Sequence, residues 1–118
     1  MRTFGWILSL SITFACDAFA SELLTTCTDN ETRKYSVFLD PTQHTGEISV
    51  EVPGEGGASY TYRVRNMKLK TYGQNYEIYF SEDNYFANQI LWVYNSSVRV
   101  LIFDKQQNKQ RFLGDCDL

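Results

Sequence analysis

The stretch GEISVEVPGEGGASYTYRVR, residues 46–65, determines the predicted fold because two alternating segments flank a glycine-rich turn. Residues 47–52 alternate Glu or Ser with Ile or Val, and residues 58–65 alternate Ala, Tyr or Val with Ser, Thr or Arg. A period of two is typical of a strand with one buried face. The Pro-Gly-Glu-Gly-Gly segment between the two runs predicts a loop, so this stretch is typical of neighbouring antiparallel strands.

The same alternation recurs along the chain. It is found at residues 35–39 and again at residues 76–80, where we expect Tyr76, Ile78 and Phe80 to form the apolar face. The segments 89–94 and 98–103 are apolar on both faces, which is typical of the most buried strands, and residues 111–113 predict a short last strand.

Short turns separate these segments and determine the predicted topology. Asp40-Pro41, Gly73-Gln74-Asn75 and Asn95-Ser96-Ser97 are turn sequences, and a polar connection covers residues 104–109. Short connections join strands that are neighbours in the sheet. The sequence therefore predicts an all-β fold, a small antiparallel β-barrel or sandwich of about seven to eight strands in meander topology.

Three local features depart from plain alternation. The apolar phase slips by one residue after Val64, which predicts a β-bulge near Arg65-Asn66. Residues 81–88 are compatible with one helical turn, with Ser81 as its N-cap and acidic residues in the first turn. Residues 21–25 are compatible with a helical segment too short to affect the fold.

The first twenty residues have the pattern of an export signal. Arg2 is followed by an apolar core, and Ala18 and Ala20 are the small residues that a signal peptidase requires. We expect cleavage after Ala20, which leaves residues 21–118 as a single domain in the periplasm or outside the cell.

The sequence disfavours two membrane alternatives for this segment. A transmembrane anchor is disfavoured by Asp17 and by an apolar run shorter than the ~20 residues that span a bilayer. Lipidation at Cys16 is disfavoured because Thr13 is polar and Phe14 is large where such a site needs a Leu-like and a small residue.

Two cysteines follow the predicted cleavage site, Cys27 and Cys116. An even pair in an exported chain predicts a disulfide. A metal or redox site would need closely spaced cysteines, and the two cysteines are far apart in the sequence. The formal net charge of −3 disfavours nonspecific nucleic-acid binding, which depends on Lys and Arg. The Asn-X-Ser/Thr sequences at Asn30 and Asn95 would be glycosylation sites only in a eukaryotic secretory pathway.

Few residues suggest catalysis. The only histidine, His44, stands in a predicted turn with no partner near it in sequence. Glu47 and Glu51 share a strand face, but about 13 Å separates such positions, more than a carboxylate pair in a glycosidase needs. We therefore expect a non-enzyme without cofactor or metal.

Tyrosines and charges suggest binding surfaces. All eight tyrosines follow residue 34, and Tyr79, Tyr85 and Tyr94 are the candidates for an exposed binding face as an alternative to core packing. Glu47 and Glu51 precede a strand that carries Arg63 and Arg65, so these charges are expected to pair across the sheet or to steer a basic partner.

The segment from Gly54 to Tyr60 resembles an active loop of the bacterial membrane-bound or periplasmic inhibitors of c-type lysozyme. Gly57, Ala58 and Tyr60 match best, in a chain with one cysteine before the first main strand and another near the C-terminus. Ser59 stands where the family has a basic residue, and the family's later Lys-Gly motif has no counterpart. The resemblance implies a small barrel whose loop enters the lysozyme active-site cleft.

The expected function is a non-catalytic exported binding module for a protein partner, a basic, lysozyme-like one if the resemblance applies. The expected partner-binding residues are contiguous, namely Gly56, Gly57, Ala58, Ser59 and Tyr60. One alternative is a small-ligand carrier lined by Tyr60, Tyr62 and Tyr76. Another is an envelope subunit that pairs through an edge strand at residues 111–113.

Overall fold

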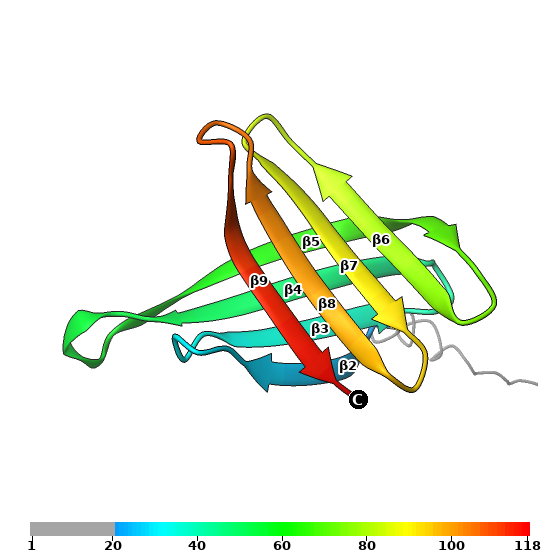
Figure 1. Cartoon of the computed structure of the whole chain (residues 1–118), viewed down its shortest axis with the longest axis horizontal. Helices are drawn as coiled ribbons and strands as arrows, with labels where there is room; N and C mark the ends of the chain where they lie inside the picture. The colour runs from blue at the N-terminus through cyan, green and yellow to red at the C-terminus, as the bar shows by residue number, and fades with distance from the viewer. Residues whose placement is uncertain (1–20) are drawn as a thin grey trace, which may run out of the picture.

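The computed structural model describes residues 21–118, and their strands form one eight-stranded antiparallel sheet (Figure 1). Each strand pairs with its neighbour in the sequence, which confirms the predicted meander. The predicted signal segment, with Cys16 and the cut after Ala20, lies outside the described residues. The strands are β2 (Glu22–Thr28), β3 (Lys34–Asp40), β4 (Thr45–Pro53), β5 (Ser59–Tyr72), β6 (Tyr76–Glu82), β7 (Phe86–Val93), β8 (Ser97–Asp104) and β9 (Lys109–Asp117).

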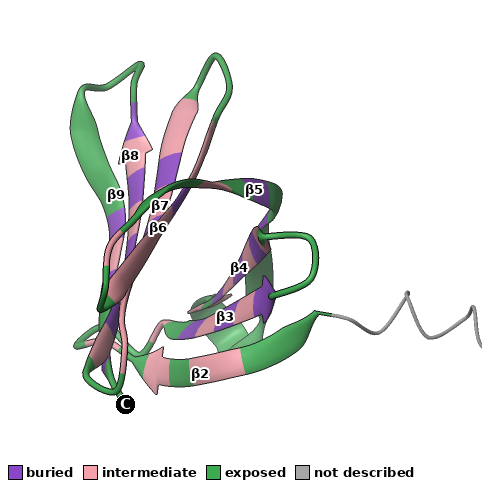
Figure 2. Ribbon diagram, turned by 90° about the vertical axis from the view of Figure 1, so that its right-hand side faces the viewer, coloured by how far each residue is buried: buried purple, intermediate pink, exposed green. Residues whose placement is uncertain are grey.

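The sheet curls into a nearly closed barrel, which confirms the predicted fold class. Strands β2–β5 form one half and β6–β9 the other, and the two halves face each other (Figure 2). The strand order is open between β2 and β9, but Cys27 of β2 and Cys116 of β9 form the predicted disulfide, with their Cα atoms 5.4 Å apart. A covalent link therefore joins the two strands at the seam of the barrel.

The core lies between the two halves and comes from the alternating apolar positions. Each strand sends every second side chain inward, so the buried residues follow the period of two. The largest fully buried side chains are Tyr35, Tyr79, Ile48, Met67, Ile90 and Ile102.

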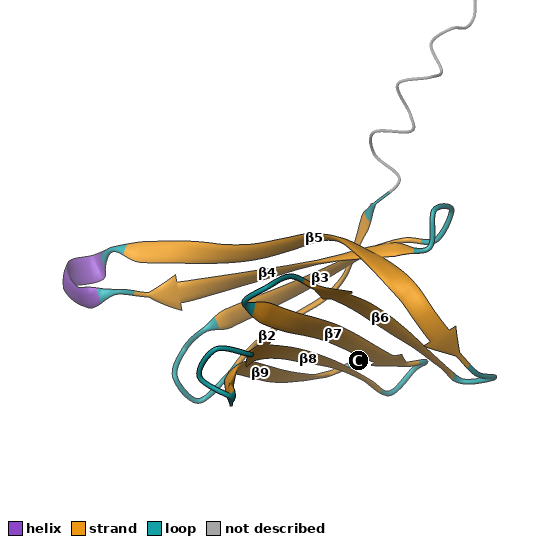
Figure 3. Ribbon diagram, turned by 90° about the horizontal axis from the view of Figure 1, so that it is seen from above, coloured by secondary structure: helices purple, strands orange, loops and turns teal. Residues whose placement is uncertain are grey.

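A β-bulge in β5 lies at the predicted position. Gly46 of β4 faces Met67 and Ile48 faces Val64, so one residue of β4 is opposed by Arg65 and Asn66 of β5. Asn66 has a φ of 58°, in the left-handed region. Bulges bend a strand, and most of the pairing of the 14-residue β5 with β4 lies before the bulge, whereas its pairing with β6 lies entirely after it. This strand connects the two halves of the barrel (Figure 3).

Both predicted helical segments are wrong. Residues 81 and 82 end β6, residue 86 begins β7, and Asp83 Oδ1 accepts hydrogen bonds from the backbone N–H groups of Tyr85 (2.8 Å) and Phe86 (2.7 Å). An aspartate that bonds its own backbone in this way favours a tight turn over a helix. Residues 22–25 belong to β2, because pairing with β3 satisfies their backbone groups.

The predicted apolar face of β6 is also wrong. Tyr79 points into the core with 1% of its surface exposed, whereas Phe80 lies on the outer surface beneath Lys70, whose Nζ is 4.4 Å from the ring centroid. Ile78 shares the outer face with Phe80, since alternate residues point the same way. Both alternating sets of β6 contain apolar residues, so periodicity alone does not distinguish the inner face.

Candidate functional site

The hairpin of β4 and β5 extends away from the barrel, and the predicted partner-binding residues form its tip (Figure 3). A 3₁₀ turn covers Glu55–Gly57, and the N–H of Gly54 donates to the carbonyl oxygen of Ala58 at 2.5 Å. Gly56 and Gly57 have φ angles of 71° and 83°, a region that glycine adopts readily. A Cβ atom added at either glycine would meet nothing within 4 Å, so the tip is surrounded by open space.

Tyr60 is the large side chain of this tip. It is the second residue of β5, pairs with Val52 of β4, and has 51% of its surface exposed. Residues 56–59 are also exposed. All five predicted partner-binding residues therefore lie together on a projecting surface, with none of them in the core.

A groove of about 390 Å³ lies beside Tyr60 and the end of β4 next to the tip. Val52 and Pro53 of β4 form part of its wall, and Lys109 and Arg111 of β9 form another part. Within residues 21–118, neither Lys109 nor Arg111 makes an ion pair, while the Arg111 guanidinium carbon lies 5.4 Å from the Phe112 ring centroid. The groove therefore presents two basic groups that no carboxylate of the described chain neutralises.

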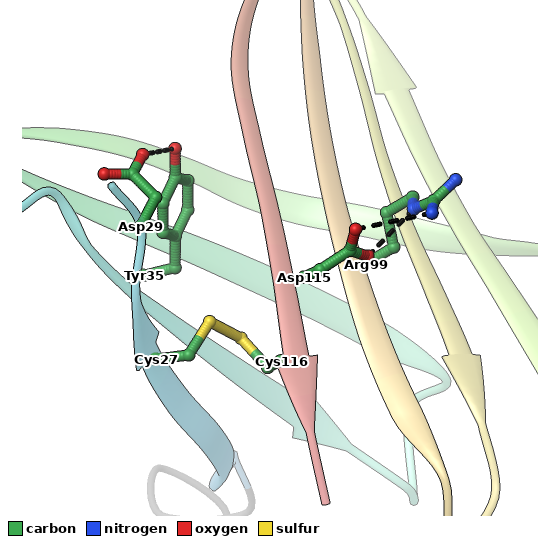
Figure 4. Close-up of a disulfide and its surroundings, with 6 residues drawn as sticks. All are labelled: Cys27, Asp29, Tyr35, Arg99, Asp115 and Cys116. Atoms are coloured by element: carbon green, nitrogen blue, oxygen red, sulfur yellow. Dashed lines mark hydrogen bonds and ion pairs between the residues drawn. A yellow bond between two sulfur atoms is a disulfide. The ribbon is translucent and has the colours of Figure 1, made fainter. Parts of the chain in front are cut away.

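Arg33 adds a third basic group to the groove, but it is held by acidic neighbours. Its Nε lies 2.7 Å from Asp29 Oδ2 and its Nη2 lies 3.1 Å from Glu31 Oε2. Burial lowers the pKa of Arg33, but the hydrogen bond to Asp29 and the charges of Asp29 and Glu31 act together against it, and the net pKa is raised. Asp29 also accepts a 2.8 Å hydrogen bond from the buried Tyr35 hydroxyl (Figure 4), so the turn before β3 is fixed to the core.

The sequence did not predict this groove. Its basic side chains come from the start of β3 and from β9, which are more than 70 residues apart in numbering and meet only because the barrel curls. A pattern of alternating residues contains no information about which distant strands lie side by side. The only sign of the groove in the local sequence is the pair of basic residues, Lys109 and Arg111, near the start of the last strand.

A second cavity lies at the other end of β4, where His44 precedes the strand. This cleft has a volume of about 240 Å³. Its lining residues are Glu22, Leu23, Leu24, Leu39, Pro41, His44, Glu77, Tyr79 and Trp92.

Glu77 is the central polar group of the cleft. Its Oε2 accepts a 2.6 Å hydrogen bond from the Tyr94 hydroxyl, and its Oε1 accepts one from the Tyr79 hydroxyl. The hydrogen bond to Glu77 raises the pKa of Tyr94 to about 12, and burial together with the same carboxylate raises the pKa of Tyr79. Both tyrosines therefore remain hydrogen-bond donors at neutral pH.

The other tyrosines predicted to bind a partner or a ligand differ in their exposure and in their neighbours. Tyr85 is 60% exposed, as expected of a binding residue, whereas Tyr79 is buried and is not part of an exposed face. Of the three tyrosines predicted to line a carrier cavity, Tyr60 is exposed, Tyr62 packs against Phe86 and Phe112, and Tyr76 lies against Gly73. The carrier lining predicted from sequence is therefore wrong, because these rings do not enclose one space.

The predicted charge pairing between strands is found at one position. Arg63 Nε of β5 lies 3.6 Å from Glu47 Oε2 of β4. Both side chains are partly exposed, so the pair contributes less than about 1 kcal/mol to stability. His44 was expected to be a solvated turn residue, and the structure places it at the edge of the cleft with a φ of 55°.

Comparison with protein-family models, with curated proteins and with solved structures finds no match for this chain. Among residues 21–118, no helix is long and apolar enough to cross a membrane. The same residues contain no cluster of three His, Cys, Asp or Glu side chains arranged to hold a metal ion.

Proposed function

We propose that the protein is an exported, non-catalytic binding module that inserts the β4–β5 tip, residues 56–60, into a cleft of a protein partner. The partner class that fits best is a c-type lysozyme. The observation that carries the proposal is the exposed Tyr60 in a projecting tip, beside a groove that contains basic groups without an ion-pair partner among the described residues. Tyrosine is enriched at protein interfaces because it supplies a large contact area and a hydroxyl at low entropic cost.

The charge of the groove supports an enzyme cleft as the target. Glycosidases carry a pair of catalytic carboxyl groups in the cleft that binds their substrate. Lys109 and Arg111 lie in the same groove as Tyr60, so an inserted tip would bring them near such carboxylates.

The overall charge and the hydrogen bonding of the tip also support binding to a basic protein partner. The formal net charge of −3 favours encounter with a basic protein. The hydrogen bond between Gly54 and Ala58 holds the loop in one shape before binding, which reduces the entropy lost on association. Because no residue of the tip is buried, substitutions there should affect binding without unfolding the barrel.

The test is a calorimetric titration of the purified, oxidised protein with a c-type lysozyme, together with an assay of lysozyme activity. We expect submicromolar binding and inhibition. Tyr60→Ala should weaken binding by about 30-fold, since truncation of an interface tyrosine commonly costs about 2 kcal/mol.

Tyr72→Ala is the matched control, because Tyr72 is 70% exposed at the opposite end of the same strand. It should bind lysozyme like the unaltered protein. Absence of both heat and inhibition at tens of micromolar would reject lysozyme as the partner. Equal losses in the two tyrosine variants would reject the tip as the binding element.

A further inference from the structure

The cleft beside His44 is separate from the proposed partner-binding tip. Thr45 and Pro53 are the two ends of β4, and the cleft lies beyond the first while the tip lies beyond the second. Its wall comes from β2, β3, the β3–β4 turn, β6 and β7. At about 240 Å³ it is smaller than the 300–1,000 Å³ typical of sites for drug-sized ligands, so its dimensions suit a small molecule.

The lining of the cleft combines an apolar wall with negative charge. Leu24, Leu39 and Pro41 provide aliphatic surface, and Glu22 and Glu77 provide two carboxyl groups. Neither Lys nor Arg is among the lining residues. A ligand that enters this space therefore meets acidic groups without a competing side-chain ammonium or guanidinium.

Glu77 is held in place from both sides. The hydroxyl groups of Tyr79 and Tyr94 each donate to a different carboxylate oxygen. An ionised carboxylate has about four lone-pair positions, so two hydrogen bonds orient Glu77 and leave it able to accept more. Each carboxylate oxygen therefore keeps the capacity to accept a hydrogen bond from a ligand.

Aromatic rings complete the site. Trp92 and Tyr79 line the cleft, and the Trp92 ring meets the Tyr94 ring edge to face at a centroid distance of 4.7 Å. The faces of such rings attract cations. The indole Nε1 of Trp92 is buried and has no hydrogen-bond partner among the described residues, an exception to the usual pairing of buried polar groups.

We propose that this cleft binds a small organic ammonium ion with an apolar chain. The ammonium group would donate to Glu77 and lie near Trp92, and the chain would contact Leu24 and Leu39. This inference does not depend on the lysozyme proposal, since it concerns the other end of the molecule. It differs from the carrier predicted from sequence both in its lining residues and in its requirement for a charged ligand.

The test compares three probes of equal chain length and different head group: hexylamine, hexanol and hexanoate. Binding is followed by the indole N–H resonance of Trp92 in ¹H–¹⁵N NMR spectra, assigned with Trp92→Phe. We expect hexylamine to shift this resonance saturably with an affinity of about 1 mM, as suits a ligand of this size. Hexanol should bind at least about 10-fold more weakly, and hexanoate should cause no shift. Equal binding of the three probes, or no shift with hexylamine at about 20 mM, would overturn the proposal.

Two charge variants identify the carboxylate. Glu77→Gln should remove the preference for hexylamine over hexanol, while Glu51→Gln, the same change at an exposed position of β4, should leave it unaltered. If Glu77→Gln does not fold, Glu22→Gln at the rim tests the charge requirement, with an expected loss of about threefold in hexylamine affinity. An unchanged preference in each carboxylate variant that folds would overturn the proposal. Tyr60→Ala should bind hexylamine normally, so this proposal and the lysozyme proposal can fail independently.

Discussion

At the scale of the residue, the core leaves no room for a side chain where Gly114 of β9 faces the ring of Tyr35. A Cβ atom at residue 114 would lie 2.8–2.9 Å from three atoms of that ring, closer than side chains approach in real structures. The ring is fully buried, and its hydroxyl donates to Asp29, so it has little freedom to move aside. The glycine is therefore required by space, with no positive φ to explain it.

Gly114→Ala should lower the free energy of unfolding by about 1–3 kcal/mol, the usual cost of overpacking a core. Urea denaturation monitored by circular dichroism measures the change. Asp117→Ala, an exposed position three residues along the same strand, is the control and should change stability by less than about 0.5 kcal/mol. Equal stability of Gly114→Ala and the unaltered protein would mean that Tyr35 can move away from β9.

At the scale of the element, β5 is the strand that makes the barrel possible. Its first part lies in the projecting hairpin with β4, and its last part pairs with β6. The bulge at Arg65-Asn66 lies between these parts and provides the extra residue that lets the strand bend. The same strand therefore both carries Tyr60 outward and connects the two halves of the sheet.

The left-handed backbone at Asn66 makes this bulge sensitive to residue type. Asn66→Val should destabilise the protein by about 1–2 kcal/mol, because a β-branched residue strongly disfavours a positive φ. Asn66→Gly should be close to neutral, because glycine adopts this conformation readily. Residue 66 is exposed, so lost packing contributes little to either value. Thermal unfolding compares the two variants, and similar melting temperatures would argue against a strained bulge.

At the scale of the whole molecule, the seam between β2 and β9 is the point at which the barrel depends on a covalent bond. The disulfide joins residues 89 apart in sequence, across strands that the sheet order leaves as its two edges. Closing a loop of this length is worth about 4–5 kcal/mol in the chain-entropy treatment. That is comparable with the whole net stability of a small domain.

Replacement of Cys27 and Cys116 together by serine should therefore lower the free energy of unfolding by about 4 kcal/mol. Native-state hydrogen exchange should show the largest loss of protection in β2 and β9, because each is an edge strand that only one neighbouring strand still holds. Chemical reduction of the unaltered protein should reproduce both effects. A double variant with unchanged stability would indicate that packing alone closes the seam.

The sequence alone determined the strands from β3 to β9, their order and most turns, because period-two alternation and turn chemistry are local properties. It also determined the bulge at Arg65-Asn66, from a one-residue slip of phase, and the cysteine pair, from there being only two after residue 20. It was wrong at residues 81–88, where the side chain of Asp83 forms a tight turn, and at residues 21–25, where residues 22–25 belong to β2, which pairs with β3.

Only the tertiary structure decided which face of β6 is buried and which residues meet across the barrel. Both alternating sets of β6 are partly apolar, so the inner face depends on how β5 bends at its bulge. The groove with Lys109 and Arg111 and the cleft around Glu77 each combine segments far apart in the sequence. Their assembly depends on the curl of the sheet and on the disulfide at its seam, and no local pattern contains that information.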